Sequence, residues 1–247
     1  MDGSRLPVIK ALQFHRITPE FQFCGTWNTP VQFDAFLHVL RSENIRVVLP
    51  GDHDDGIVIT FDDGERNVYE HAFPILKKYG YRAVIFLVVN YVGRENRWDV
   101  AVGPHVQHLS WDEIMEMKQW GIEFGSHTLT HRNMTKLTND EVERELSESK
   151  RILERKLGAC TSISYPFNRT SPAVIQKVRD AGYMYGFGGS GSNPFTIKKE
   201  AVYITDTVRS FATKVMETPC VLYRYERMKQ RIINYFTIAT MLNKRGK

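Results

Sequence analysis

The chain has 247 residues, of which 42% are hydrophobic and 25% charged, and it carries a formal net charge of +5 at neutral pH. This composition suits one large α/β domain with a sizeable core, and the lack of repeats or biased segments excludes a repeat or low-complexity protein. Three cysteines, an odd number without the spacing of a metal site, fit a reducing compartment: Cys24, Cys160 and Cys220.

The N-terminal segment lacks the apolar stretch of an export signal, so the sequence as given predicts a cytoplasmic protein. Residues 8–17 then have the pattern of a strand, and His15 stands near its end. The histidines outside the motifs described below lack such a strand-end position, and we expect surface or structural roles for them: His38, His53, His71, His105 and His108.

Residues 57–61 form the clearest predicted strand, because an apolar, β-branched run ends abruptly in two carboxylates, Asp62 and Asp63. Charge at the point where a buried strand surfaces is typical of the catalytic edge of an α/β enzyme. Two aspartates before a glycine also make a common turn, so this segment alone leaves a purely structural role open. A helix over residues 67–79 and a strand over residues 82–88 follow.

The next connection, residues 90–109, is long and has neither a helical nor a strand period. As a loop between a strand and a helix, it would lie on the catalytic face of the sheet. Trp98 within this loop could stack on a sugar ring, or it could equally pack its own loop against the domain. Both interpretations stay open on the sequence alone.

Two helices in the second half begin with capping boxes, in which a Ser or Thr cap is followed three residues later by Glu. The first runs from Ser110 to about Trp120, and the second runs from Thr138 to about Gly158. A short strand over residues 122–124 separates them. The alternation of strands and helices predicts a parallel sheet.

Two histidines four residues apart, His127 and His131, follow the short strand. On a turn or a helix start, this spacing brings two imidazoles close enough to bind one ion. Such a pair also arises by chance in a chain with eight histidines, so it is weak evidence alone. Its position directly after a strand, like that of Asp62 and Asp63, strengthens it, because one carboxylate and two imidazoles make a catalytic metal site with open positions.

A third segment, residues 165–167, follows a strand near Ile163 in the same way. A helix over residues 171–182 comes next, and strands over residues 183–187 and 202–205 end the pattern. Three polar or turn-forming segments thus follow three predicted strands. In a parallel sheet, the ends of these strands meet at one edge.

In order and spacing, the three segments resemble the motifs of the NodB-homology polysaccharide deacetylases, carbohydrate esterase family 4. Residues 60–64 are identical to the family's first motif, Thr-Phe-Asp-Asp-Gly, and His127, Thr128 and His131 match the second. The resemblance implies an α/β fold, a single distorted (β/α) barrel of about seven strands, which we assign to residues 1–220.

By this resemblance, Asp62 is the general base of the reaction. The residues that hold a divalent metal are then Asp63, His127 and His131. Zinc is the expected ion, although Co²⁺, Ni²⁺ or Mn²⁺ also suit these ligands. The backbone N–H of Phe167 is expected to donate to the developing oxyanion, and Tyr165 and Trp98 are candidate substrate contacts.

The third motif departs from the usual form of the family. An arginine usually stands two residues before the proline and steadies the base, but this chain has Ser164 there. Losing that positive neighbour predicts that Asp62 titrates higher than it does in arginine-bearing relatives.

The late histidine that usually supplies the catalytic acid is also missing, because no histidine follows His131. The N-terminal Phe-His pair at residues 14–15 resembles the start of the exopolysaccharide deacetylase branch, whose motifs are circularly permuted. In a barrel the first strand neighbours the last, so permutation moves the acid in sequence and not in space. We therefore assign His15 as the general acid.

Residues 221–247 form a separate basic tail in our division of the chain. From residue 223 to the end it has seven basic residues and one acidic residue, a net charge of +6. Its apolar run, residues 232–242, is too short to span a bilayer but could lie on an anionic membrane, or it could pack as a final helix on the barrel. No nucleic-acid-binding motif accompanies the charge, so we do not expect nucleic acid as a partner.

The sequence therefore predicts a metal-dependent hydrolase that removes N-acetyl or similar small acyl groups from an amino-sugar polysaccharide or glycoconjugate. One alternative is a deformylase or deacetylase of a lipid-linked sugar, peripheral at the inner membrane face, which the missing export signal and the basic tail suggest. Another is a non-catalytic carbohydrate-binding relative. The presence of Asp62, useful for catalysis but not for ligating metal, argues against it.

Overall fold

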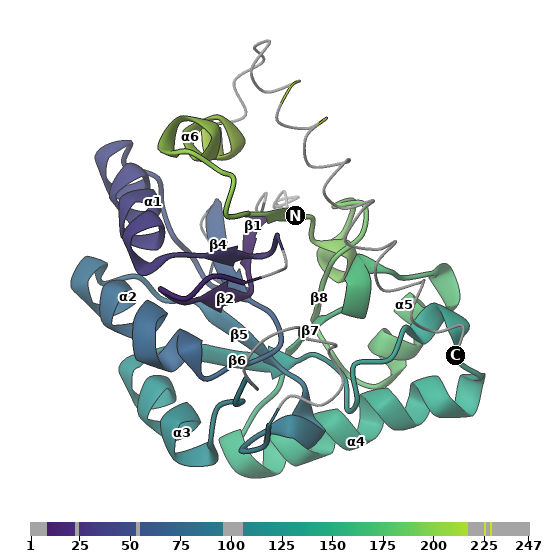
Figure 1. The fold of residues 1–247 in the computed structure, drawn as a ribbon. Coiled ribbons are helices and arrows are strands. Elements are labelled where there is room, and N and C mark those ends of the chain that lie inside the picture. Colours follow the sequence, from purple (N-terminus) through teal and green to yellow (C-terminus); the bar gives the residue numbers. More distant parts are fainter. Residues whose placement is uncertain are drawn as a thin grey trace.

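A parallel sheet of seven strands, curved until it nearly closes into a barrel, forms the centre of the protein (Figure 1). The computed structural model describes residues 9–22, 25–52, 55–95 and 106–216, together with Tyr225 and Met228. Trp98 and all but those two residues of the predicted tail therefore lie outside the described residues.

Neighbouring strands of this sheet all pair in parallel, which confirms the predicted fold class. Across the sheet the order is β8 (Tyr185–Phe187), β7 (Ser162–Ser164), β6 (Glu123–Ser126), β5 (Val84–Leu87), β4 (Gly56–Phe61), β1 (Ile9–Phe14) and β9 (Lys199–Ala201). A second, two-stranded sheet consists of β2 (Arg16–Ile17) and β3 (Trp27–Asn28). The predicted first strand is thus divided in two, and His15 stands at the division.

Helices cover the outside of the sheet (Figure 1). The α-helices are α1 (Pro30–Ser42), α2 (Phe73–Tyr79), α3 (Trp111–Trp120), α4 (Asn139–Leu157), α5 (Pro172–Asp180) and α6 (Val208–Met216). Shorter turns are the π-helix η1 (Val68–Ala72) and the 3-10 helices η2 (Val89–Tyr91), η3 (Met134–Lys136), η4 (Pro166–Asn168) and η5 (Pro194–Thr196). Among the helices that the structure describes, none is long and apolar enough to cross a membrane.

Capping chemistry explains where three of these helices begin. The predicted capping boxes are present at the starts of α3 and α4. A third box, formed by Thr29 and Gln32, starts α1, with Pro30 at the first helical position. We did not predict α1, although these residues carry the same start signals as the other two helices.

The barrel closes through one stretch of chain. Lys199–Ala201 pairs with β1, while Ile197 forms a bridge with Phe187 of β8. The predicted last strand, residues 202–205, is wrong in position, because the apolar residues that suggested it follow the strand. Tyr203, for example, is buried and lies beneath Lys214 of α6, whose Nζ is 5.2 Å from the ring centroid.

Alternation along the strands divides the core into two parts. Outward-facing residues such as Ile59 and Phe61 pack against the helices in the larger hydrophobic cluster. Inward-facing residues such as Val58 and Phe86 fill the barrel in a smaller cluster. Continuing the same alternation along β4 brings Asp62 to the inner face, above this apolar filling. The polar residues at the carboxyl end of the barrel therefore lie directly above its apolar interior.

Candidate active site

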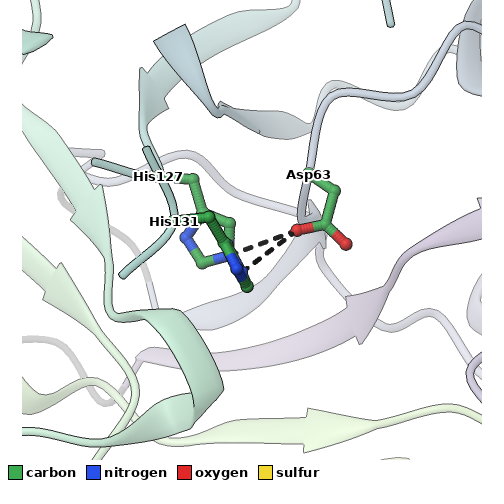
Figure 2. A group of neighbouring side chains, drawn as sticks. All are labelled: Asp63, His127 and His131. Carbon is green, nitrogen blue, oxygen red and sulfur yellow. Dashed lines mark ion pairs between the residues drawn. The ribbon is translucent and has the colours of Figure 1, made fainter. Parts of the chain in front are cut away.

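Three predicted metal ligands meet at the carboxyl ends of β4 and β6, two strands that flank β5 in the sheet. Asp63 follows β4, and His127 and His131 follow β6. Each of the three offers a ligand atom within 4.8 Å of the others, and both histidine Nε2 atoms lie 3.5 Å from Asp63 Oδ1. Figure 2 shows the two imidazoles directed at this carboxylate. One carboxylate and two imidazoles fit a divalent cation with positions left for other ligands.

The protonation of His127 favours metal binding. Its Nδ1 lies 2.8 Å from the carbonyl oxygen of Ser164, which can only accept, so Nδ1 carries the proton and Nε2 presents its lone pair to the site. Burial lowers the pKa of His127 to about 4, although Asp62 opposes the shift. Burial, followed by the charge of His127, likewise holds the pKa of His131 well below its ordinary value. Both imidazoles are therefore neutral at pH 7, as ligands must be.

Unusual backbone conformations gather at this site. Six described residues other than glycine have a positive φ, a conformation that costs roughly 1–3 kcal/mol where the surroundings impose it. Five of them are in or next to the three motifs: Asp63 (71°), Thr128 (65°), His131 (59°), Phe167 (61°) and Asn168 (52°). The hydroxyl of Thr128 accepts the backbone N–H of His131 at 3.0 Å, which ties the histidine loop together.

A glutamate that sequence reasoning missed also fixes this loop. Glu145 of α4 is buried, and its Oε2 accepts the backbone N–H groups of Leu129 and Thr130, both at 2.9 Å. The hydroxyl of Thr130 donates to the other carboxylate oxygen. The available signal was its place beside Val142 and Leu146 on the buried stripe of α4, where an acidic residue needs a partner.

The proposed base, Asp62, is buried and held on both oxygens. Ser164 Oγ donates to Oδ1 at 3.1 Å, while Gln13 Nε2 and Lys199 Nζ donate to Oδ2 at 2.7 and 2.5 Å. Burial raises the pKa of Asp62. The positive charge of Lys199, followed by those of protonated His127 and His15, outweighs this effect, so the pKa of Asp62 lies well below its ordinary value. The carboxylate is thus ionised at neutral pH.

Lys199 also corrects an expectation from the sequence. With Ser164 in place of an arginine, we predicted a carboxyl that lacks one positive neighbour and has a higher pKa than in arginine-bearing relatives. The structure instead supplies a cation from β9, the strand at the far end of the sheet order from β7. Closure of the barrel brings β7 and β9 together. The motif sequence alone does not show that these two strands are close in space.

His15 lies where the permuted order predicts, beside Asp62. The register pairs Phe14 with Phe61, so His15 and Asp62, the residues that follow β1 and β4, are neighbours at the carboxyl end of the barrel. His15 Nε2 is 3.4 Å from Gln13 Nε2, and its Nδ1 is buried without a hydrogen-bond partner among the described residues. Burial lowers the pKa of His15 despite the opposing charge of Asp62.

The remaining predicted residues have different outcomes. The ring of Phe167 packs edge-on against His131, with centroids 4.9 Å apart, so its turn adjoins the metal ligands. Tyr165 does not fit a substrate contact: its side chain is buried, and its hydroxyl donates to the carbonyl of Phe195 at 2.8 Å. The alternation of β7 continues into the turn. Ser164 faces the inside of the barrel, so Tyr165, the next residue, faces outward into the larger hydrophobic cluster. Trp98 lies outside the described residues.

A groove with a volume of about 550 Å³ opens beside this turn. Asn168 connects the groove to the site, because its Nδ2 donates to Gln13 Oε1 at 3.1 Å and Gln13 in turn donates to Asp62. Hydroxyl and amide groups of this kind suit hydroxyl-bearing ligands. Other lining residues are Thr135, Arg169, Thr170, Ser171 and Ser190.

The model of the polysaccharide deacetylase family matches residues 51–186, more than half of the chain, a range that includes all three predicted metal ligands. The chain belongs to the polysaccharide deacetylase family. A relative in this family, the poly-β-1,6-N-acetyl-D-glucosamine N-deacetylase of Staphylococcus aureus (strain MSSA476), is 31% identical over 139 residues, which are 52% of this chain and 46% of the relative. The chain spans less than half the length of the curated relatives it matches.

Solved structures of the family agree with the fold. The polysaccharide deacetylase BC0361 of Bacillus cereus aligns with a TM-score of 0.70 and 27% identity, covering 84% of this chain and 68% of that one. The deacetylase PplD of Streptococcus pyogenes, solved with acetate, aligns with a TM-score of 0.71 over 85% of this chain and 98% of that one. At 21% identity, this second likeness supports the fold alone.

Proposed function

We propose that the protein is a metal-dependent deacetylase that removes acetyl or similar small acyl groups from amino sugars. One observation carries the proposal: the cluster of Asp63, His127 and His131 lies beside an ionised, buried carboxylate, Asp62, in a chain of the polysaccharide deacetylase family. Zinc suits the three ligands best. When bound, such a cation supplies a water of lowered pKa and polarises the acyl carbonyl.

The residues of the chain would carry the proton transfers. Asp62 accepts a proton from the attacking water, and the backbone N–H of Phe167 donates to the oxyanion that forms as the new C–O bond is made. Burial keeps His15 neutral in the resting protein, so an acid role requires that it receive a proton during turnover. Asp62, beside it, is the source. His15 then protonates the nitrogen as the C–N bond breaks, which leaves a carboxylic acid and a free amine.

The relatives and the groove support a substrate class for this proposal. The Staphylococcus aureus relative is named for N-deacetylation of poly-β-1,6-N-acetyl-D-glucosamine, and we propose an N-acetylated glucosamine polymer for this chain. An open groove beside the site supports a polymer over a small, enclosed ligand. A lipid-linked sugar at an anionic membrane, bound with help from the basic tail, is the second proposal, and an N-formyl group is the acyl group that would distinguish it.

The test is acetate release from β-1,6-linked N-acetylglucosamine oligomers of increasing length, with one Zn²⁺ per chain. We expect release that chelation abolishes and added metal restores, and that rises with oligomer length. Asp63→Ala and His127→Ala should lose both bound metal and activity. Release of formate from N-formyl amino sugars, without release of acetate, would favour the second proposal. A zinc-loaded protein that binds oligomers and releases nothing would be a non-catalytic relative.

A further inference from the structure

A buried lysine, Lys199, contacts one oxygen of the proposed base directly and the other through Ser164. Its side chain is 1% exposed, and its Nζ donates to Asp62 Oδ2 at 2.5 Å and to Ser164 Oγ at 2.6 Å. Ser164 Oγ passes on a hydrogen bond to Asp62 Oδ1 at 3.1 Å. The lysine, serine and carboxylate therefore form a closed triangle, in which Asp62 cannot rotate without breaking a contact with one of its partners.

This lysine is the main counter-charge of the carboxylate. Among the described residues, Lys199 is the only lysine or arginine that forms an ion pair with Asp62, and the other donors, Gln13 and Ser164, are neutral. His127 Nε2 lies farther away, at 3.8 Å, and carries no proton there when it ligates metal. Among the described residues that contact Asp62, Lys199 is thus the one that supplies a cationic hydrogen-bond donor to the carboxylate.

The fold delivers the amine only when the barrel closes. Lys199 is the first residue of β9, level with Ala11 of β1, and the chain just before it bridges to β8. Its long side chain runs up the inside of the barrel to the carboxyl ends of β4 and β7. The same short segment thus completes the sheet and completes the surroundings of the base.

We infer that Lys199 is the positioning residue for Asp62, taking the place of a cation that the Ser164 position does not supply. It is not a catalytic residue, since its buried Nζ contacts the carboxylate and the serine and not the groove. The inference rests on the proposed function, because it assigns to Lys199 the task of holding in place the carboxylate that accepts the proton.

The protein contains a matched control. Lys214 of α6 is also a lysine with a 1% exposed side chain, and its Nζ lies 2.5 Å from Asp206 Oδ2. This second pair is part of the contact between α6 and the chain that follows β9. Lys199→Met and Lys214→Met therefore remove the same charge from the same degree of burial, and only the first removal is beside the metal ligands.

The test measures kcat, KM, bound metal and thermal unfolding of full-length variants with an N-acetylglucosamine oligomer. Lys199→Met should lower kcat about 100-fold, the loss expected when a reacting group is misplaced by about 1 Å, while KM and bound metal stay near wild type. Lys214→Met should lower the unfolding temperature and leave kcat of the folded protein unchanged. Lys199→Met with full metal and the kcat of wild type would overturn the inference.

A double-mutant cycle separates action through Asp62 from a general structural effect. Adding Lys199→Met to Asp62→Asn should change the residual kcat little, because the base is already gone. A neutral amide needs no cation, so Asp62→Asn should also recover much of the unfolding temperature that Lys199→Met loses, and none of the loss in Lys214→Met. Ser164→Arg in the Lys199→Met background, which returns a cation to the neighbouring position, should restore part of kcat.

The thermal cycle needs no substrate, so it separates the two hypotheses. If wild type releases no acyl group but the cycle is non-additive, the proposed function fails and the pairing of Lys199 with Asp62 stands. If wild type is active and the thermal cycle is additive, the proposed function stands and the inference fails.

Discussion

Two buried lysine–aspartate pairs in this protein, Lys199 with Asp62 and Lys214 with Asp206, have nearly the same geometry. In each, Nζ lies 2.5 Å from a carboxylate oxygen, and neither lysine side chain is more than 1% exposed. Their surroundings differ. Lys214 also donates to the carbonyl of Ala201, and Asp206 accepts the backbone N–H of Tyr203, so that pair fastens α6 to the end of the sheet.

The other pair is surrounded by groups that can react. Asp62 is flanked in sequence by Asp63, a proposed metal ligand, and in space by His15 and His127, and it connects to the groove through Gln13 and Asn168. A short, buried ion pair is therefore by itself no sign of catalysis. Lys199 and Asp62 differ from the α6 pair because the predicted metal ligands, His15 and the groove lie near them.

The largest expected effect separates the two aspartates. Asp62→Asn keeps the shape and hydrogen bonds of the side chain but removes the base, so kcat should fall about 100- to 10,000-fold with metal retained. Asp206→Asn should leave kcat of the folded protein near wild type and lower the free energy of unfolding by about 3–5 kcal/mol, because Lys214 loses its counter-charge. Kinetics and urea unfolding check both. An active Asp62→Asn enzyme would remove the distinction between the pairs.

The sequence predicted which polar residues gather around Asp62 at the carboxyl end of the barrel, but not the residues that support them. Asp62, Asp63, His127 and His15 could be identified because each stands at the end of an apolar strand, where local pattern and position coincide. Lys199 could not, because Lys198-Lys199-Glu200 reads as a charged surface stretch until closure of the barrel buries the side chain of its middle lysine. Strand ends are local features, whereas the partners of a buried charge are chosen by packing over long separations.

The same distinction explains the smaller errors. The strand predicted at residues 202–205 was placed by its apolar residues, which record burial beneath α6 and not pairing with β1. Tyr165 was proposed as a substrate contact because it lies in a motif turn. The alternation of β7 instead directs its side chain into the core, where it is buried. The whole fold class followed from repeated strand–helix units, which are local, and from the family resemblance of the motifs.

The second prediction concerns His15, the histidine that adjoins only the first pair. His15→Gln should lower turnover about 100-fold or more for amide substrates, because the departing nitrogen needs a proton, while metal content and unfolding temperature stay near wild type. Aryl acetate esters, whose leaving group needs less protonation, should lose much less activity. His38→Gln on α1 is the matched control and should affect neither substrate. Equal losses for amide and ester would contradict the acid assignment.

The smallest expected effect is on stability and distinguishes the two regions by pH. Because burial lowers the pKa of His127 from 6.5 to about 4, the unfolded chain binds a proton below pH 6.5 that the folded, metal-free protein does not. The folded state then binds fewer protons, so its free energy of unfolding falls as the pH is lowered from 6.5 toward 4, by about 3 kcal/mol in all for a shift of that size.

Urea unfolding of the metal-free protein at pH 7, 6 and 5 should show this slope in wild type and a shallower one in His127→Asn. The α6 pair contains no histidine, so Lys214→Met should lower the whole curve and leave its slope over this range as it is in wild type. Wild type and His127→Asn with the same slope would mean that His127 does not titrate as its burial requires.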